Sequence, residues 1–263
     1  MSSLSTFEAG FLIITFLFMV GSMFGWVLEL FFRRFISTKN PSRKWINPGF
    51  LVGPCLPLYG FGLTLLFIMS LMPYVGHDGA ASITAARVFW AIIAMGILMT
   101  VIEYIAGLIF IRGMKIKLWD YSDEWGNIQG IICPKFSIIW TVLAALYYFF
   151  VQPYVIRMVQ WFSDNIAFSF VVGMFYGIFI IDLVYSLNIV GKVRRFAVEN
   201  DVVVKYETLK QEIRSETDML KKRGRFILAF NPERELKNVM EESLERIRFV
   251  KIPRKKDNDG KRS

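Results

Sequence analysis

The feature that most constrains this chain is a series of long, nearly uncharged apolar stretches in its first 187 residues. A helix of about 20 apolar residues crosses the ~30 Å hydrocarbon core of a bilayer, and stretches this long and uniform are too apolar for the core of a water-soluble domain. We therefore predict an all-α integral membrane protein with about five transmembrane helices. The five stretches are Phe11–Phe32, Leu51–Met72, Val88–Ile111, Phe136–Val155 and Ile166–Leu187.

The basic residues are distributed very unevenly along the chain. Of the 31 Lys and Arg residues, 20 follow Leu187, five lie between the first two stretches and four between the third and the fourth. Only Arg87 and Arg157 fall on the opposite side. Because cytoplasmic flanks of membrane helices carry the positive charge, we predict an inner (cytoplasmic) cell membrane protein with its N-terminus outside. Residues 1–187 then form a transmembrane domain, and residues 188–263 form a basic cytoplasmic tail.

The tail has the apolar periodicity of amphipathic helices. A second predicted helix starts at Asn231-Pro232, an N-cap followed by proline at the first helical position, and the charged end after Lys251 is expected to be disordered. The 20 basic residues of the tail are offset by 13 acidic ones, so nucleic-acid binding is not expected, whereas anionic membrane lipids suit the cluster at Lys192, Arg194 and Arg195. The first helical stripe consists of Val202, Tyr206, Leu209, Ile213 and Leu220.

Three acidic residues lie within the predicted spans, all in the cytoplasmic half: Glu29, Glu103 and Asp182. A charged side chain in the bilayer costs several kcal/mol, so each is a candidate for a functional site unless a structural partner explains it. Glu29 could pair with Arg33 one helical turn later. Asp182 could reach toward Lys192 or the lipid headgroups. Glu103 lies deepest in its span and is the hardest to explain structurally.

Two predicted cytoplasmic segments add polar groups at the same surface. The segment from Asn47 to Gly62 holds three prolines and four glycines at the entrance of a span, so its backbone is expected to be irregular and to offer free amides and carbonyls to a ligand. A tight turn before an ordinary span is the alternative. The second segment runs from Trp119 to Gly130 and is rich in aromatic and acidic residues. Its Asp120 and Asp123 either order the loop through local hydrogen bonds or bind a divalent cation through oxygen ligands.

Several motifs follow one another in order along the transmembrane sector. They are Gly25-Trp26-x-x-Glu29, Asn47-x-Gly49-Phe50-Leu51-x-Gly53-Pro54-x-x-Pro57-x-Tyr59-Gly60, Glu103-Tyr104, Trp119-Asp120-Tyr121-Ser122, Asn127-Ile128-x-Gly130-x-Ile132-Cys133, and Trp140. With these motifs the chain resembles the family named Putative ABC-transporter type IV, also called CmpB-like permeases, from about Phe16 to Ser186. The resemblance implies a multi-pass permease-type membrane protein of an ABC transporter. Many relatives carry an acid at the position of Ile111 and an arginine at that of Ile131, and this chain has neither charge.

The chain contains no nucleotide-binding motif of the G-x-x-x-x-G-K-[ST] type, since Gly191-Lys192 and Gly260-Lys261 are followed by Val193 and Arg262. An ATPase subunit would therefore be a separate protein, and a homo-oligomer or hetero-complex is expected. We predict a transport function with a cytoplasm-facing acidic and aromatic site that binds a cationic substrate or protons. The predicted site residues are Trp26, Glu29, Asn47, Tyr59, Glu103, Tyr104, Trp119, Asp120, Tyr121, Asn127 and Asp182.

Two other functions remain open from the sequence. One is a membrane-embedded enzyme acting on a lipid or isoprenoid, with Glu103, Asp120 and Asp123 as acid/base groups or magnesium ligands. The single histidine, His77, is predicted on the outer side, so no Ser-His or Cys-His pair can form at the inner site. The other is a scaffold whose basic tail recruits a cytoplasmic partner or anionic lipid.

Overall fold

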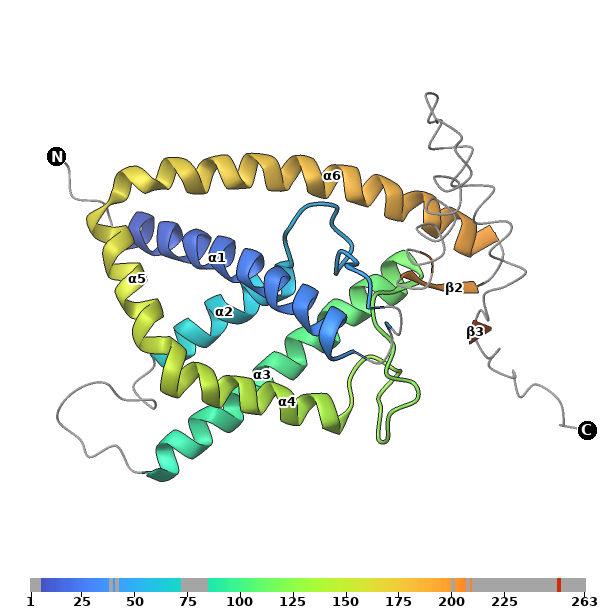
Figure 1. Cartoon of the computed structure of the whole chain (residues 1–263), viewed down its shortest axis with the longest axis horizontal. Coiled ribbons are helices and arrows are strands. Elements are labelled where there is room, and N and C mark those ends of the chain that lie inside the picture. The colour runs from blue at the N-terminus through green and yellow to red at the C-terminus, as the bar shows by residue number, and fades with distance from the viewer. Residues whose placement is uncertain are drawn as a thin grey trace, which may run out of the picture. The chain divides into compact units, whose positions relative to one another are not determined.

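The computed structural model describes residues 6–37, 40, 43–71, 85–199, 202–206, 209 and 250–251. The chain is predominantly helical (Figure 1) and divides into two compact units, residues 1–108 with 120–189 and residues 109–119 with 190–263. The predicted all-α membrane fold is confirmed, whereas the orientation and the helical tail stay predictions. Within the described residues, four helices are long and apolar enough to span a membrane: Thr6–Phe35, Ala85–Gly113, Pro134–Asp164 and Ile166–Glu199.

The second predicted span, Leu51–Met72, differs from the expectation. Its helix α2 covers only Pro57–Ser70, and 14 residues extend about 21 Å, which is less than the thickness of the hydrocarbon core. Residues 51–56 before it are irregular, with Pro57 at the start of the helix. Gly49 adopts a positive φ of 73°, a conformation that glycine permits without strain. The expected irregular backbone at the entrance is therefore present, and it occupies part of the predicted span.

Helix α1 (Thr6–Phe35) packs closely against α2 through small residues. Gly21 faces the carbonyl oxygen of Tyr59, where an added Cβ would lie at 2.9 Å, and an added Cβ at Gly60 would meet the Ser22 Oγ. Small residues let helix backbones approach this closely in membranes. The contact fixes Tyr59 against Gly25 on α1, where no larger side chain fits.

The third and fourth spans each contain a π-helical turn. Helix α3 (Ala85–Leu108) continues into the π-turn Ile109–Gly113. Helix α4 (Pro134–Leu146) continues through the π-turn Tyr147–Val151 into α5 (Gln152–Asp164), which turns away from α4 in Figure 1. The predicted stretch Phe136–Val155 is therefore bent near its C-terminal end. After the short helix Ile166–Phe168, helix α6 runs from Ser169 to Glu199, beyond the expected end of the last span.

The main apolar core of the first unit lies between α1, α2, α3, α4 and α5. The fully or nearly fully buried members are Leu17, Leu66, Phe67, Met95, Met99, Ala144, Tyr147, Val155 and Val159.

The second unit contains a small three-stranded sheet. Strand β1 (Ile116–Lys117) pairs in parallel with β2 (Val202–Lys205), and β2 pairs antiparallel with β3 (Val250–Lys251). The prediction that Val202 begins a helical stripe is wrong, because this residue starts a strand. Pairing with the loop after α3 outweighs the weak helical periodicity of its β-branched residues. The predicted continuation at Ile213 and Leu220, the second tail helix and His77 lie outside the described residues.

Candidate functional site

Glu103 is the most deeply buried carboxylate of the described chain and lies on α3. Its side chain is 3% exposed. The Tyr121 hydroxyl donates to its Oε1 at 3.0 Å, and the Trp140 indole Nε1 donates to its Oε2 at 2.8 Å. Both donors are electrically neutral, and no Lys, Arg or His of the described residues forms an ion pair with Glu103. The carboxylate is thus held in a fixed position without a countercharge.

Glu29 on α1 has a different environment. Arg33 Nε lies 2.8 Å from its Oε1, so the predicted pairing one helical turn apart is present. The hydroxyl of Tyr59 donates to the other carboxylate oxygen at 3.0 Å. Gly25 leaves the space in which the Tyr59 ring lies, so the close packing of α1 and α2 directs this hydroxyl at Glu29.

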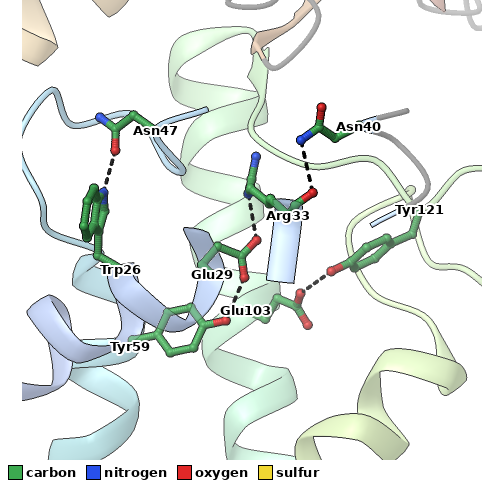
Figure 2. Close-up of polar contacts among 8 residues, drawn as sticks. All are labelled: Trp26, Glu29, Arg33, Asn40, Asn47, Tyr59, Glu103 and Tyr121. Carbon is green, nitrogen blue, oxygen red and sulfur yellow. Dashed lines mark hydrogen bonds and ion pairs between the residues drawn. The ribbon is translucent and has the colours of Figure 1, made fainter. Parts of the chain in front are cut away.

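The two glutamates belong to one polar cluster. Figure 2 shows Glu29 on α1 with the Tyr59 hydroxyl directed at it, and Glu103 on α3 with the Tyr121 hydroxyl directed at it. The ring of Tyr59 also meets the ring of Trp140 edge to face, with centroids 6.0 Å apart. The cluster therefore brings together two carboxylates, one arginine and the aromatic side chains of Tyr59, Tyr121 and Trp140 in the same unit.

The loop between α3 and α4 is ordered so that Tyr121 reaches Glu103. The backbone N–H of Tyr121 donates to the carbonyl of Gly130, and the Asn127 side chain both donates to loop carbonyls and accepts from the Gly130 N–H. The Tyr121 ring stacks on Phe136 with centroids 4.2 Å apart. Burial, and after it the adjacent Glu103 carboxylate, raise the pKa of Tyr121 far above its usual range, so the hydroxyl remains a donor.

The two aspartates of this loop do not gather further metal ligands. Asp120 Oδ1 accepts from the backbone N–H and the hydroxyl of Ser122, which is the local loop-ordering bond that was one of the two expectations. Asp123 is exposed. Among the described residues, no group of three or more His, Cys, Asp or Glu side chains comes together, so the divalent cation at Asp120 and Asp123 stays a prediction.

The irregular segment before α2 is held by two polar side chains. Trp26 on α1 donates its indole N–H to Asn47 Oδ1, and the amide of Asn47 donates to the carbonyls of Leu51 and Val52. These contacts satisfy backbone groups that a regular helix would have satisfied internally. Trp26 and Asn47 therefore shape the segment, and Figure 2 places them beside the carboxylate cluster without a bond to it.

Asp182 on α6 also forms hydrogen bonds with the backbone of this segment. Its Oδ1 accepts from the N–H of Val52 at 3.1 Å and its Oδ2 from the N–H of Gly53 at 3.0 Å, while Ser186 donates to Oδ1 at 3.2 Å. The alternative that Asp182 reaches toward Lys192 or the lipid headgroups stays a prediction, since Lys192 belongs to the second unit. Two successive amides are a favourable anion-binding arrangement, which explains an acid at this depth.

The structure thus brings together part of the predicted set. Glu29, Tyr59, Glu103 and Tyr121 form the cluster, while Asn127 and Asp120 order the loop that carries Tyr121. Trp26, Asn47 and Asp182 hold the irregular segment. Tyr104 is half-buried and forms no hydrogen bond to either glutamate among the described residues. Trp119 belongs to the second unit, so its role in the site stays a prediction.

Two residues of the site were not predicted from the sequence. Trp140 supplies one of the two donors to Glu103, and a tryptophan inside a span is a usable signal because its indole N–H needs a partner when buried. Asn40 is 4% exposed, and its side chain donates to the carbonyls of Arg33 and Lys44, closing the loop after α1 (Figure 2). A single asparagine in a polar loop carries no pattern that marks such a role.

Comparison with known proteins assigns the chain to one family. The family described as Putative ABC-transporter type IV matches residues 16–187, which include α1 from Phe16 onward, the whole of α2, α3, α4 and α5, and the carboxylate cluster. No curated protein and no solved structure matches the chain. Because the match covers more than half of the chain and the structure has the spanning helices that such a protein requires, this membrane protein belongs to the Putative ABC-transporter type IV family.

Proposed function

We propose that the protein is the permease subunit of a transporter and that Glu103 binds a cationic substrate, either a protonated amine or a proton. The observation that carries this proposal is the buried carboxylate of Glu103, whose two hydrogen-bond partners are neutral. An ionised carboxylate in a medium of low dielectric constant is costly unless it is paired. A cation that binds beside it offsets that cost, and so does a proton.

The charges around the cluster favour a cation over an anion. Glu29 and Arg33 neutralise each other, which leaves the charge of Glu103 in excess. The aromatic rings of Tyr59 and Trp140 lie beside the carboxylates, and the faces of aromatic rings attract ammonium groups. An anionic substrate would meet repulsion from Glu103 and has no free countercharge in the cluster.

We further propose the membrane arrangement that such a subunit needs. The N-terminus lies outside, residues 188–263 form the cytoplasmic tail of an inner-membrane protein, and a separate ATPase subunit supplies the energy. The positive charge between the first two predicted spans and in the tail supports this orientation. The site then opens to the cytoplasm at the loop of residues 120–130, whose Tyr121 contacts Glu103.

Flux in inverted membrane vesicles tests the proposal. Vesicles from cells that overproduce the protein retain native partner subunits, and they are supplied with ATP and with radiolabelled methylammonium or a trapped pH-sensitive dye. We expect Glu103→Gln to reduce the flux of the transported probe at least about tenfold, because the amide keeps the shape and removes the charge. The matched control is Glu124→Gln, which changes a partly exposed glutamate paired with Lys135 at 2.8 Å on the loop surface.

Two results would contradict the proposal. One is wild-type flux of both probes in Glu103→Gln vesicles that contain normal amounts of protein. The other is a flux in wild-type vesicles no higher than in vesicles from cells lacking the protein. Purification from native membrane with mild detergent tests the partner separately, and we expect an ATPase with a nucleotide-binding motif in the eluate.

A further inference from the structure

A second group of buried polar side chains lies at the corner between α4 and α5, away from the glutamates. Tyr147 is 5% exposed and Gln152 is 2% exposed. The hydroxyl of Tyr147 and the Oε1 of Gln152 have no hydrogen-bond partner among the described residues. The two residues bound the π-turn, in which the N–H of Gln152 donates to the carbonyl of Tyr147. π-turns within helices are frequent at functional sites.

Nearby residues do not satisfy these two atoms. Ser70 at the end of α2 lies beside Tyr147 without a hydrogen bond to its hydroxyl, and the Ser70 hydroxyl itself donates to the carbonyl of Phe67 at 2.7 Å. Gln152 begins the buried face of α5, which continues with Val155 and Val159, so apolar groups adjoin it. A buried donor or acceptor without a partner costs about 1–3 kcal/mol. Apolar side chains of similar shape would avoid that cost. Two unpaired polar atoms at the same corner therefore indicate a ligand that forms hydrogen bonds with them.

The corner is connected to the glutamate cluster by one helix face. Tyr147 lies seven residues after Trp140, which is two helical turns or about 10 Å along α4. Ala144, 1% exposed, lies between them on the same buried face. The core cluster that contains Tyr147, and against which Trp140 packs, also contains Met95 and Met99, whose unbranched side chains change rotamer easily. Met99 is also within 2.7 Å of the position that a Cβ on Gly62 would take.

We propose that Tyr147 and Gln152 form a second binding station for the same cationic substrate, at the outer end of the path that begins at Glu103. This inference rests on the proposed function. A hydroxyl and an amide oxygen are neutral acceptors, so they bind a group rich in donors, such as an ammonium ion with its water, without trapping it as a carboxylate would. The substrate passes between the two stations when the Met95 and Met99 side chains move aside.

Paired measurements of flux and stability test the second station. The variants are Tyr147→Phe and Gln152→Met, and Tyr154→Phe is the control because its ring is 66% exposed on the same helix. If the two side chains serve a ligand, each variant lowers methylammonium flux about tenfold or more. The melting temperature in detergent stays unchanged or rises, because an unpaired polar atom has been removed. The control retains both flux and melting temperature.

The outcomes separate this inference from the proposed function. Normal flux in both variants, with flux lost in Glu103→Gln, overturns the second station and leaves the proposed function intact. A melting temperature that falls together with flux also overturns it, since the side chains would then hold the fold. If Glu103→Gln has no effect, an experimental structure with methylammonium decides the station alone. We expect density within hydrogen-bonding distance of Tyr147 OH and Gln152 Oε1, and its absence refutes the proposal.

Discussion

Replacing Gly25 with alanine should destabilise the protein through the α1–α2 contact. An added Cβ would lie 2.2 Å from the Tyr59 Cβ and 2.3 Å from its Cγ. Carbon atoms in contact are about 3.5–4.0 Å apart, so Tyr59 or the whole of α2 must move by more than about 1 Å. Such overpacking costs about 1–3 kcal/mol. Displacement of Tyr59 also breaks its bond to Glu29, and hydrogen bonds to charged groups are worth about 1.5–3 kcal/mol.

We therefore expect Gly25→Ala to lower the free energy of unfolding by about 2.5–6 kcal/mol, the sum of these two contributions. The assay is unfolding in mixed micelles with increasing SDS, followed by circular dichroism. Gly173→Ala on α6 is the matched control, because an added Cβ there meets nothing within 4 Å. The control should be neutral or stabilising by up to about 1 kcal/mol from helix propensity. Equal unfolding curves for the two variants would refute the reasoning.

Three further changes test the polar contacts. Trp140→Phe removes one donor from buried Glu103 and should lower the free energy of unfolding by about 1.5–3 kcal/mol in the same micelle assay, whereas an unchanged curve would contradict the bond. Asp182→Asn weakens the hydrogen bonds from the Val52 and Gly53 amides, so hydrogen exchange of residues 51–56, followed by mass spectrometry, should accelerate. An unchanged exchange rate would show that this contact does not hold the segment. Cys55 is buried, so in Cys133→Ser protein its maleimide labelling should be slow in the folded state and fast once SDS unfolds the protein. Equally fast labelling of the folded protein would contradict this burial.

The apolar stretches predicted the membrane class well because length and hydrophobicity act locally. They did not predict that α2 is shorter than a span. Its start depends on Pro57 and on the hydrogen bonds that Asn47 and Asp182 form with the backbone of residues 51–53. The bend after Leu146 was also missed, because a π-turn adds a residue without altering the apolar composition. Both features depend on tertiary contacts that periodicity does not contain.

The three acidic residues could be picked out from the sequence, but which of them lie together could not. Glu29, Glu103 and Asp182 are conspicuous because acids are rare in apolar stretches. The structure connects Glu29 with Glu103 through the ring contact of Tyr59 and Trp140, while Asp182 binds the amides of Val52 and Gly53 instead. Position along the sequence cannot distinguish these roles, because it does not say which of the three spans lie next to one another. The prediction that Tyr121 contributes to the site agrees with its bond to Glu103.

The bond between Val52 and Asp182 has a consequence for biosynthesis. Its partners are 130 residues apart in the chain, so the amides of the irregular segment have no Asp182 to bind while α3, α4 and α5 are being made. At a synthesis rate of about 5–20 residues per second, the ribosome needs roughly 7–26 s to reach the acid. During that interval the segment before α2 must stay in water or in the insertion machinery. Membrane entry of α2 should therefore be completed only after α6 arrives, and truncation before Asp182 should leave residues 49–56 accessible to protease.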